Sequence, residues 1–378
     1  MIDYNKIPSP CYVIEEEKFR RNLQLIQKTG EEAGVELILA YKGFAMWKTF
    51  SIVSEYIKGA TASSLYEARL ACEEMNCEPH TYAPVYLENE MPDIIKYSSY
   101  ISFNSLSQFN KYKGLIEKIK PSVSVGLRVN PGWSPVKTDL YNPSSPGSRL
   151  GIDSLLLGDK LPDGVDGLHF HALCENNSYD LEKLLQHFIN QYEKYFHQLK
   201  WVNFGGGHLV THKDYNTDHL IQILKAFKNK YNLHVILEPG SAFAWETGVL
   251  VSTVQDIVVS GGTKTAILDV SFTAHMPDCL EMPYKPSIMG ATNEIIGKPA
   301  YRIGGVSCLA GDFIGNWSFD HELKAGDKII FEDMIHYTMV KTTMFNGVSH
   351  PSIGMWTKEN TFELFKAFTY EDYKGRLS

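Results

Sequence analysis

Strand-like and helix-like segments alternate along the first two thirds of this 378-residue chain. Eight short apolar runs, rich in β-branched and aromatic residues, are separated by segments with helical periodicity. Because a parallel strand pair needs a long crossover, usually a helix, this alternation predicts a parallel sheet, and eight repeats predict a closed barrel. The expected strands are 37–41, 59–62, 80–84, 100–103, 123–130, 165–171, 201–204 and 234–238. We therefore predict an α/β fold of the (β/α)8 TIM-barrel type.

The segments between these strands carry helix signals. The expected helices are 64–75, 88–96, 106–119, 180–197 and 217–230, with Asp180 and Asn216 as N-caps. A doubly wound open sheet is the alternative architecture, but no Gly-x-Gly-x-x-Gly motif follows the first strand. After residue 246 the pattern changes to β-branched runs separated by glycine pairs. Runs at 248–259, 265–270, 301–309, 328–332 and 337–341 predict an antiparallel β domain there.

Composition and charge argue against several classes of protein. Hydrophobic residues make up 44% of the chain and charged residues 21%, as in ordinary globular proteins. No apolar run approaches the roughly 20 residues that a membrane span requires. The net charge of −8 argues against a surface for nucleic acid or anionic membranes. The N-terminus does not resemble a signal peptide, and the six cysteines lack paired spacing, so we expect a cytoplasmic protein with reduced thiols.

Single reactive residues follow the ends of several predicted strands. Lys42 follows the first strand, His171 ends the sixth and Glu238 the eighth, and Gly205-Gly206-Gly207 follows the seventh. In a parallel barrel these ends meet at one rim, where barrels of this type keep their active sites. A partly desolvated lysine can form a Schiff base, and consecutive glycine N–H groups can converge on a phosphate. Together they suggest pyridoxal phosphate, with Glu238 paired to its pyridine nitrogen.

Each of these residues also has an ordinary structural interpretation. A strand-end lysine can simply extend to solvent, a glycine run can be a tight turn, and a carboxylate can be solvated. His169 and His171 share one strand face, the geometry of a metal site, with His208 as a third ligand nearby. We expect instead that one histidine packs against a cofactor ring while the other is structural, and we predict no metal. The long irregular segments 130–148 and 271–286 are candidate active-site walls.

Taken together, these features resemble the fold type III pyridoxal-phosphate decarboxylases, the ornithine and diaminopimelate decarboxylase family with the alanine-racemase fold. The resemblance runs from residues 9–14 to residues 345–347. It implies a pyridoxal-phosphate barrel at 16–246 and a β domain formed by 1–15 and 247–378. It also implies a homodimer with shared active sites, in which the β domain contributes to the active site and the dimer interface.

The same resemblance implies roles for individual residues. Lys42 matches the Schiff-base lysine, His171 the histidine stacked on the pyridine ring, and Glu238 the partner of its nitrogen. The phosphate loop matches Gly205, Gly206 and Gly207, and Tyr337 matches a tyrosine near the phosphate. Cys308 and Asp312 match the segment contributed across the dimer, with Cys308 as the proton donor. On spacing alone, neither Cys308 nor Tyr337 stands out.

Departures from the family pattern shape the substrate expectation. Leu309 and Ser241 differ from the diaminopimelate decarboxylase pattern, and Thr61 replaces the aspartate usual in ornithine decarboxylases. Residues 269–286 instead resemble the carboxynorspermidine and carboxyspermidine decarboxylase branch, which implies decarboxylation of these triamines in polyamine biosynthesis. The acidic residues expected to bind substrate ammonium groups are Asp269, Asp278, Glu281 and Asp312, with most motif support for Asp278. The alternatives are a diaminopimelate- or ornithine-type decarboxylase, a racemase, a metal-dependent barrel hydrolase and a non-catalytic regulator.

Overall fold

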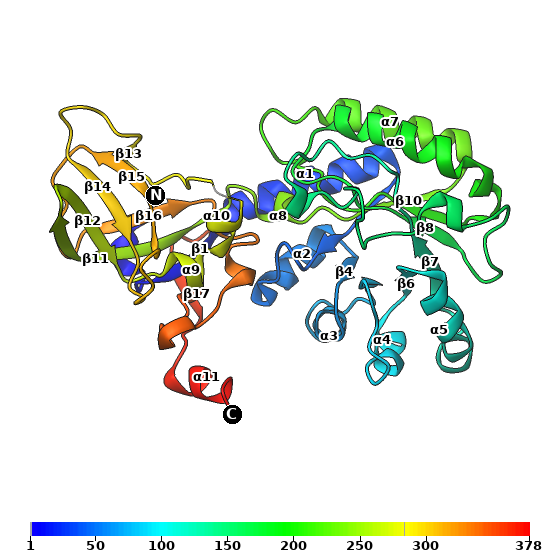
Figure 1. Cartoon of the computed structure of the whole chain (residues 1–378), viewed down its shortest axis with the longest axis horizontal. Coiled ribbons are helices and arrows are strands. Elements are labelled where there is room, and N and C mark those ends of the chain that lie inside the picture. Colours follow the sequence, from blue (N-terminus) through cyan, green and yellow to red (C-terminus); the bar gives the residue numbers. More distant parts are fainter. Residues whose placement is uncertain (1, 283) are drawn as a thin grey trace. The chain divides into compact units, whose positions relative to one another are not determined.

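The computed structural model describes residues 2–282 and 284–378, and the chain divides into two compact units. The barrel unit is residues 22–243, and the β unit combines the chain up to residue 21 with the chain from residue 244. Figure 1 labels many of the elements of both units. The expected boundary at residue 16 differs from this division because helix α1 (Glu16–Ala33) starts in the β unit and continues into the barrel unit.

The barrel unit is built on a ring of parallel strands. In chain order they are β2 (Glu36–Leu37), β3 (Leu39–Ala40), β4 (Ala60–Ala62), β5 (His80–Tyr82), β6 (Tyr100–Phe103), β7 (Ser124–Arg128), β8 (Gly167–His169), β9 (Trp201–Asn203) and β10 (His234–Leu237). Strands β2 and β3 are two halves of the first predicted strand. Because β2 pairs with β10 and β3 pairs with β4, both in parallel, the sheet closes on itself. The predicted barrel is confirmed.

Helices follow most of the strands and flank the sheet (Figure 1). They are α2 (Phe50–Tyr56), α3 (Leu65–Glu74), α4 (Met91–Tyr97), α5 (Leu106–Ile119), α6 (Ser178–Tyr192), α7 (Thr217–Tyr231) and α8 (Ser241–Ala244), which ends at the unit boundary. The side chain of Asn216 accepts the His219 N–H and caps α7, as predicted. The prediction that Asp180 caps α6 is wrong, because Asn177 accepts the first N–H groups. Asp180 lies in the first turn, where a negative charge favours the helix dipole.

Two glycines inside the barrel make room for one large aromatic side chain. A Cβ atom at Gly126 would lie 2.4 Å from the Trp201 ring, and one at Gly167 would lie 2.1 Å from it. The indole therefore packs directly against two backbones, and its N–H donates to Ser124 Oγ at 2.8 Å. Trp201 forms a buried cluster with Ile38 and Ile236 inside the ring. This packing supports the parallel pairing of strands β7, β8 and β9.

The β unit is one mixed sheet. Its strands are β1 (Cys11–Glu15), β11 (Gly248–Ser260), β12 (Thr263–Leu268), β13 (Ala291–Thr292), β14 (Ala300–Gly304), β15 (Phe313–Phe319), β16 (Lys328–Glu332), β17 (Ser352–Trp356) and β18 (Phe362–Lys366). Most neighbours are antiparallel, as expected, but β1 runs parallel to β17 and β12 runs parallel to β14. The purely antiparallel prediction is therefore corrected. The N-terminal strand β1 lies between β11 and β17, which run in opposite directions, so it can be antiparallel to only one of them.

Short helices complete the β unit: α9 (Phe272–His275), α10 (Pro277–Glu281) and α11 (Tyr370–Gly375). The predicted strand 337–341 is wrong, because Met339–Lys341 forms a 3-10 turn and Tyr337 has a positive φ of 22°. Of the helices in the described ranges, none combines the length and apolar character needed to cross a membrane.

Candidate active site

One pocket of the barrel unit lies at the carboxyl ends of the parallel strands. Its lining residues come from six different strands or the turns that directly follow them: Lys42, Thr61, Ser63, Tyr82, Arg128, His169, His171 and Glu238. The structure thus brings together the three residues that sequence position had singled out as chemistry-bearing, namely Lys42, His171 and Glu238. Convergence of side chains from several strand ends is the usual construction of a barrel active site.

Lys42 has the environment of a lysine that loses its proton readily. The residue as a whole is exposed to solvent, but many protein atoms lie around its ammonium group. This desolvation lowers the pKa of Lys42, and the neighbouring Arg128 guanidinium lowers it further. The Nζ atom lies 3.3 Å from His171 Nε2. A neutral amine in this position is a nucleophile.

Hydrogen bonds fix the tautomer of His171. The Gly206 N–H donates to His171 Nδ1 at 2.7 Å, so this nitrogen carries no proton. Desolvation, with Lys42 as the next cause, holds the pKa of His171 well below its usual range, and the ring is therefore neutral. Its single proton then sits on Nε2 and points to the Lys42 amine, which acts as the acceptor.

The triple glycine is required by close backbone packing. Gly205 and Gly207 have φ of 68° and 87°, which side-chain-bearing residues rarely adopt. A Cβ atom at Gly206 would lie 2.4 Å from the Glu238 carbonyl oxygen and 3.0 Å from the His171 ring. The loop therefore keeps its backbone against the pocket. Its Gly205 and Gly206 N–H groups already have partners, Asn203 Oδ1 and His171 Nδ1.

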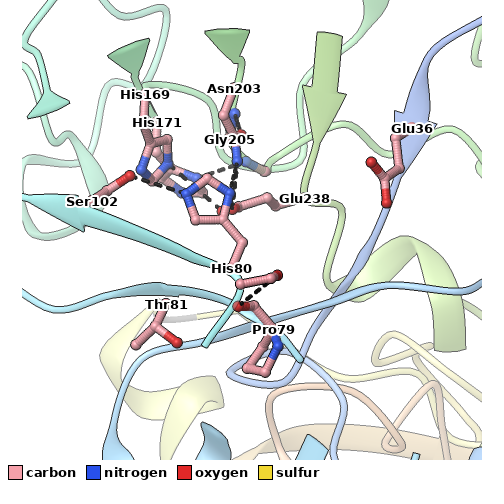
Figure 2. Close-up of polar contacts among 12 residues, drawn as sticks. Glu36, Pro79, His80, Thr81, Ser102, His169, His171, Asn203, Gly205 and Glu238 are labelled. Carbon is pink, nitrogen blue, oxygen red and sulfur yellow. Dashed lines mark hydrogen bonds and ion pairs between the residues drawn. The ribbon is translucent and has the colours of Figure 1, made fainter. Parts of the chain in front are cut away.

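Glu238 is a buried carboxylate with a dense set of neighbours. Its side chain is 6% exposed, and Oε1 accepts the Asn203 amide at 2.7 Å. Burial raises the pKa of Glu238, and the hydrogen bond from Asn203 is the largest cause that opposes this rise. His80 and His169 approach its two oxygens at 3.6 Å each (Figure 2). Desolvation lowers the pKa of both histidines, so neither is a charged partner of Glu238.

Sequence reasoning missed several lining residues. Arg128 is buried at the end of β7, its guanidinium carbon lies 4.4 Å from the centre of the Tyr82 ring, and it donates to the His171 carbonyl at 3.3 Å. Tyr82 likewise ends its strand, β5. Both positions could have been found by extending the strand-end criterion to β5 and β7.

The remaining predicted residues lie in the β unit, which is described by itself. Cys308 is exposed, and its N–H donates to Asn346 Oδ1 at 3.0 Å. Tyr337 lies beside the His336 ring in an edge-to-face contact. Asp278 is buried, and its Oδ2 accepts hydroxyl groups from Tyr284 at 3.0 Å and Thr338 at 2.7 Å.

The other three acidic candidates each have partners within the β unit. Asp312 accepts the N–H groups of Phe272, Thr273 and Ser307, which ties its loop to the start of α9. Asp269 accepts Ser9 Oγ at 2.7 Å and the Thr253 N–H at 2.9 Å. Glu281 pairs with Lys341. Their predicted contacts with substrate stay predictions.

The histidine pair does not form part of a metal-ligand cluster. Within residues 2–282 and 284–378, no group of three or more His, Cys, Asp and Glu side chains is arranged to hold a metal ion. His208 is buried. Both ring nitrogens of His171 already have partners, Gly206 and Lys42, so this ring does not offer a nitrogen to a metal ion.

Comparison with known proteins identifies the family. The sequence model for the pyridoxal-dependent decarboxylase, C-terminal sheet domain, matches residues 11–335. The chain belongs to the pyridoxal-dependent decarboxylase family. This decarboxylase is 49% identical to the carboxyaminopropylagmatine decarboxylase of Synechocystis sp., over 99% of this chain and 96% of that one. It is 44% identical to the carboxynorspermidine/carboxyspermidine decarboxylase of Campylobacter jejuni, over 99% of both.

A solved structure agrees with the fold. The crystal structure of carboxynorspermidine decarboxylase complexed with norspermidine from Campylobacter jejuni matches with a TM-score of 0.90 and 42% identity. The match covers 98% of this chain and 100% of that chain. The predictions of a barrel with a β domain and of a pyridoxal-phosphate decarboxylase are confirmed.

The pocket of this decarboxylase fits pyridoxal phosphate. The predicted partners of such a cofactor are both present, because Lys42 would offer an amine to its aldehyde carbon and Glu238 a buried carboxylate to its ring nitrogen. The His171 ring lies beside Lys42 and is fixed by the glycine loop. Because two N–H groups of that loop are already bonded, phosphate binding there remains a prediction.

Proposed function

We propose that this decarboxylase removes the α-carboxylate of carboxynorspermidine, carboxyspermidine or both, giving norspermidine and spermidine in polyamine biosynthesis. Full-length identity of 44% to an enzyme of that name, and norspermidine in the 42% identical crystal structure, support this substrate class. The observation in this chain that carries the proposal is Asp278. Its buried Oδ1 has no hydrogen-bond partner among the described residues. A lone buried carboxylate oxygen suits a substrate ammonium group.

Each pocket residue has a separate role in the proposed reaction. When bound, the cofactor supplies an electron sink that stabilises the electron pair left as carbon dioxide departs. Lys42 would hold the cofactor through its amine. Glu238 would accept a hydrogen bond from the ring nitrogen and so favour its protonated form. His171, locked by Gly206, provides a flat neutral surface for stacking.

The last step needs a proton at the α-carbon, and we assign this to the Cys308 thiol. Cys308 is exposed in its own unit, so its thiol is accessible. We propose a homodimer in which Cys308 of the partner subunit completes the pocket that contains Lys42. Tyr337, near the cofactor phosphate, and the acidic residues Asp269, Glu281 and Asp312 keep supporting roles in this proposal.

A second candidate substrate is carboxyaminopropylagmatine, because the relative of that name is 49% identical over nearly the whole chain. The two substrate classes share the carboxylated aminopropyl end and differ at the far end, which is an amine in one and a guanidine in the other. Oδ2 of Asp278 accepts the hydroxyl groups of Tyr284 and Thr338, so only the buried Oδ1 lacks a partner among the described residues. A single unpaired oxygen favours an amine, whereas a guanidine is best held by two.

The deciding experiment measures carbon dioxide released by the cofactor-loaded enzyme. Carboxynorspermidine, carboxyspermidine, carboxyaminopropylagmatine, meso-diaminopimelate and ornithine are supplied separately, with the Lys42→Ala enzyme as the blank. We expect release from the carboxylated triamines above all. Release mainly from carboxyaminopropylagmatine would establish the second candidate, and release mainly from diaminopimelate or ornithine would overturn both.

The proposal places the enzyme in the cytoplasm. All six cysteines are free, as expected for a protein kept in a reducing compartment.

A further inference from the structure

A buried chain of hydrogen bonds lies behind Glu238, inside the barrel. His80 Nε2 lies 3.0 Å from Ser102 Oγ, and His80 Nδ1 lies 2.8 Å from Asn203 Nδ2. The same Asn203 nitrogen lies 2.7 Å from Glu238 Oε1. Figure 2 shows these side chains pointing toward one another from separate strands. His80, Ser102 and Asn203 are at most 2% exposed, so protein groups rather than bulk water satisfy them.

The donor and the acceptor of every hydrogen bond in this network can be assigned. The Gly205 N–H donates to Asn203 Oδ1 at 2.8 Å, which turns the Asn203 NH2 group toward His80 and Glu238. One proton of that group goes to Glu238 and the other to His80 Nδ1. His80 is neutral because burial lowers its pKa to about 3, so its own proton sits on Nε2 and goes to Ser102. Within this hydrogen-bond network Asn203 is therefore the donor to Glu238, and Thr61 also hydrogen-bonds to the same carboxylate from outside the network.

We propose that Asn203 is a positioning residue that ties the glycine loop to Glu238 and keeps that carboxylate ionised and aimed at the cofactor ring. The inference rests on the proposed role of Glu238 as partner of the ring nitrogen. One amide joins the two parts of the site, because its oxygen holds the first glycine of the loop and its nitrogen holds Glu238.

The two acceptors beside Asn203 require an amide at this position rather than any other polar side chain. Glu238 and the Nδ1 atom of His80 are both acceptors, so the group between them must donate twice. An aspartate has the same shape but places an acceptor against two acceptors, and its added charge raises the proton affinity of the whole cluster. A serine has a single proton and cannot serve both partners.

The test compares Asn203→Asp and Asn203→Ser with a matched control, Asn216→Asp. Asn216 caps α7 in the same unit, and aspartate is an equally good cap, so the control adds the same charge without touching the pocket. Each enzyme is loaded with pyridoxal phosphate. The absorbance of the bound cofactor is then titrated with pH, and kcat and KM are measured with the best triamine substrate.

We expect the absorbance midpoint of Asn203→Asp to move upward by about one pH unit or more, and that of Asn203→Ser to move less in the same direction. We expect kcat to fall by about tenfold or more while KM changes little, because the ring nitrogen acts mainly in the transition state. Asn216→Asp should match the wild type in both. Asn203 variants that bind cofactor but keep the wild-type midpoint and kcat would overturn the proposal.

A purely structural role for Asn203 has a different signature. It would lower the melting temperature and the cofactor affinity without moving the absorbance midpoint, and that outcome also counts against the proposal. The titration uses no substrate, so it tests Asn203 even if the triamine assignment fails. If Asn203→Asp does not fold, the midpoint of the neutral Asn203→Ser enzyme decides.

Discussion

The proton positions of single residues decide what the pocket can do. Neutral His171 accepts the Gly206 N–H at Nδ1 and presents its own proton to Lys42, so the lysine amine accepts this hydrogen bond in its unprotonated form. An unprotonated amine is what attack on a carbonyl carbon requires. The lowered pKa of Lys42 and the raised pKa of Glu238 have the same first cause, desolvation. One pocket thus tunes an amine and a carboxylate in opposite senses, a common arrangement in acid–base catalysis.

At the same scale, Asp278 makes the substrate proposal testable. Asp278→Asn keeps the shape and removes the charge that an ammonium group would meet. We expect KM to rise by about tenfold or more, since a hydrogen bond to a charged group contributes about 1.5–3 kcal/mol, and to rise most for the longest triamine. Steady-state kinetics would measure this, with the exposed Asp320→Asn as control. An equal KM for every substrate in variant and wild type would count against the amine-binding role.

Single residues also show where prediction from sequence stops. Lys42, His171 and Glu238 each follow or end an apolar strand, and parallel topology alone brings such positions to one rim. His80, Ser102 and Asn203 instead sit within apolar strands, and their partners come from other strands. No local pattern in the sequence reports such a pairing, which exists only once the barrel closes.

At the scale of elements, a glycine of the loop can be compared with a glycine of a helix. Gly206→Ala would drive a Cβ atom against the Glu238 backbone at 2.4 Å, whereas Gly114 in α5 has open space around it. We expect Gly206→Ala to destabilise the fold by about 1–3 kcal/mol and to weaken cofactor binding. Gly114→Ala should stabilise it by about 0.5–1 kcal/mol, because alanine is the better helix former. Denaturant unfolding and cofactor titration measure both, and equal effects would contradict this account of the loop.

The elements of the β unit were harder to predict than those of the barrel. Barrel strands pair with the next strand along the chain, so order follows from sequence. In the β unit, Cys11 pairs with Val251 and Ser352, partners more than two hundred residues away. The direction of a strand there depends on which distant segment it pairs with. Local β-propensity predicts that a segment is a strand but does not identify its partner.

At the scale of the whole molecule, buried neutral histidines make stability depend on pH. Burial lowers the pKa of His208 to about 4, whereas an unfolded histidine titrates near about 6.5. Between these two pH values the His208 ring is protonated in the unfolded chain but not in the folded one. The free energy of unfolding therefore rises with pH, and the contribution of His208 is lost as the pH falls below about 6.5. His208 alone should lower the free energy of unfolding by about 2 kcal/mol when the pH falls from neutral to 5.

This contribution can be isolated by comparing unfolding midpoints of two variants at pH 5 and pH 7.5. His208→Gln removes the buried titrating ring, and His197→Gln removes an exposed one from the same unit. We expect the stability difference between the two pH values to shrink by about 2 kcal/mol in His208→Gln and to stay at the wild-type value in His197→Gln. The same pH dependence in both variants would show that His208 is not neutral when folded.

Assembly of the whole molecule can be tested by mixing two impaired chains. Shared sites would combine Lys42 of one chain with Cys308 of the partner subunit. Lys42→Ala and Cys308→Ala chains, when mixed and allowed to exchange, would then form dimers with one intact site and one doubly damaged site. Random pairing makes half of the dimers mixed, so about a quarter of wild-type activity should return. A chain carrying both substitutions is the control, because it restores no complete site with either single variant. If the mixture is no more active than its components, the two residues do not meet across a dimer.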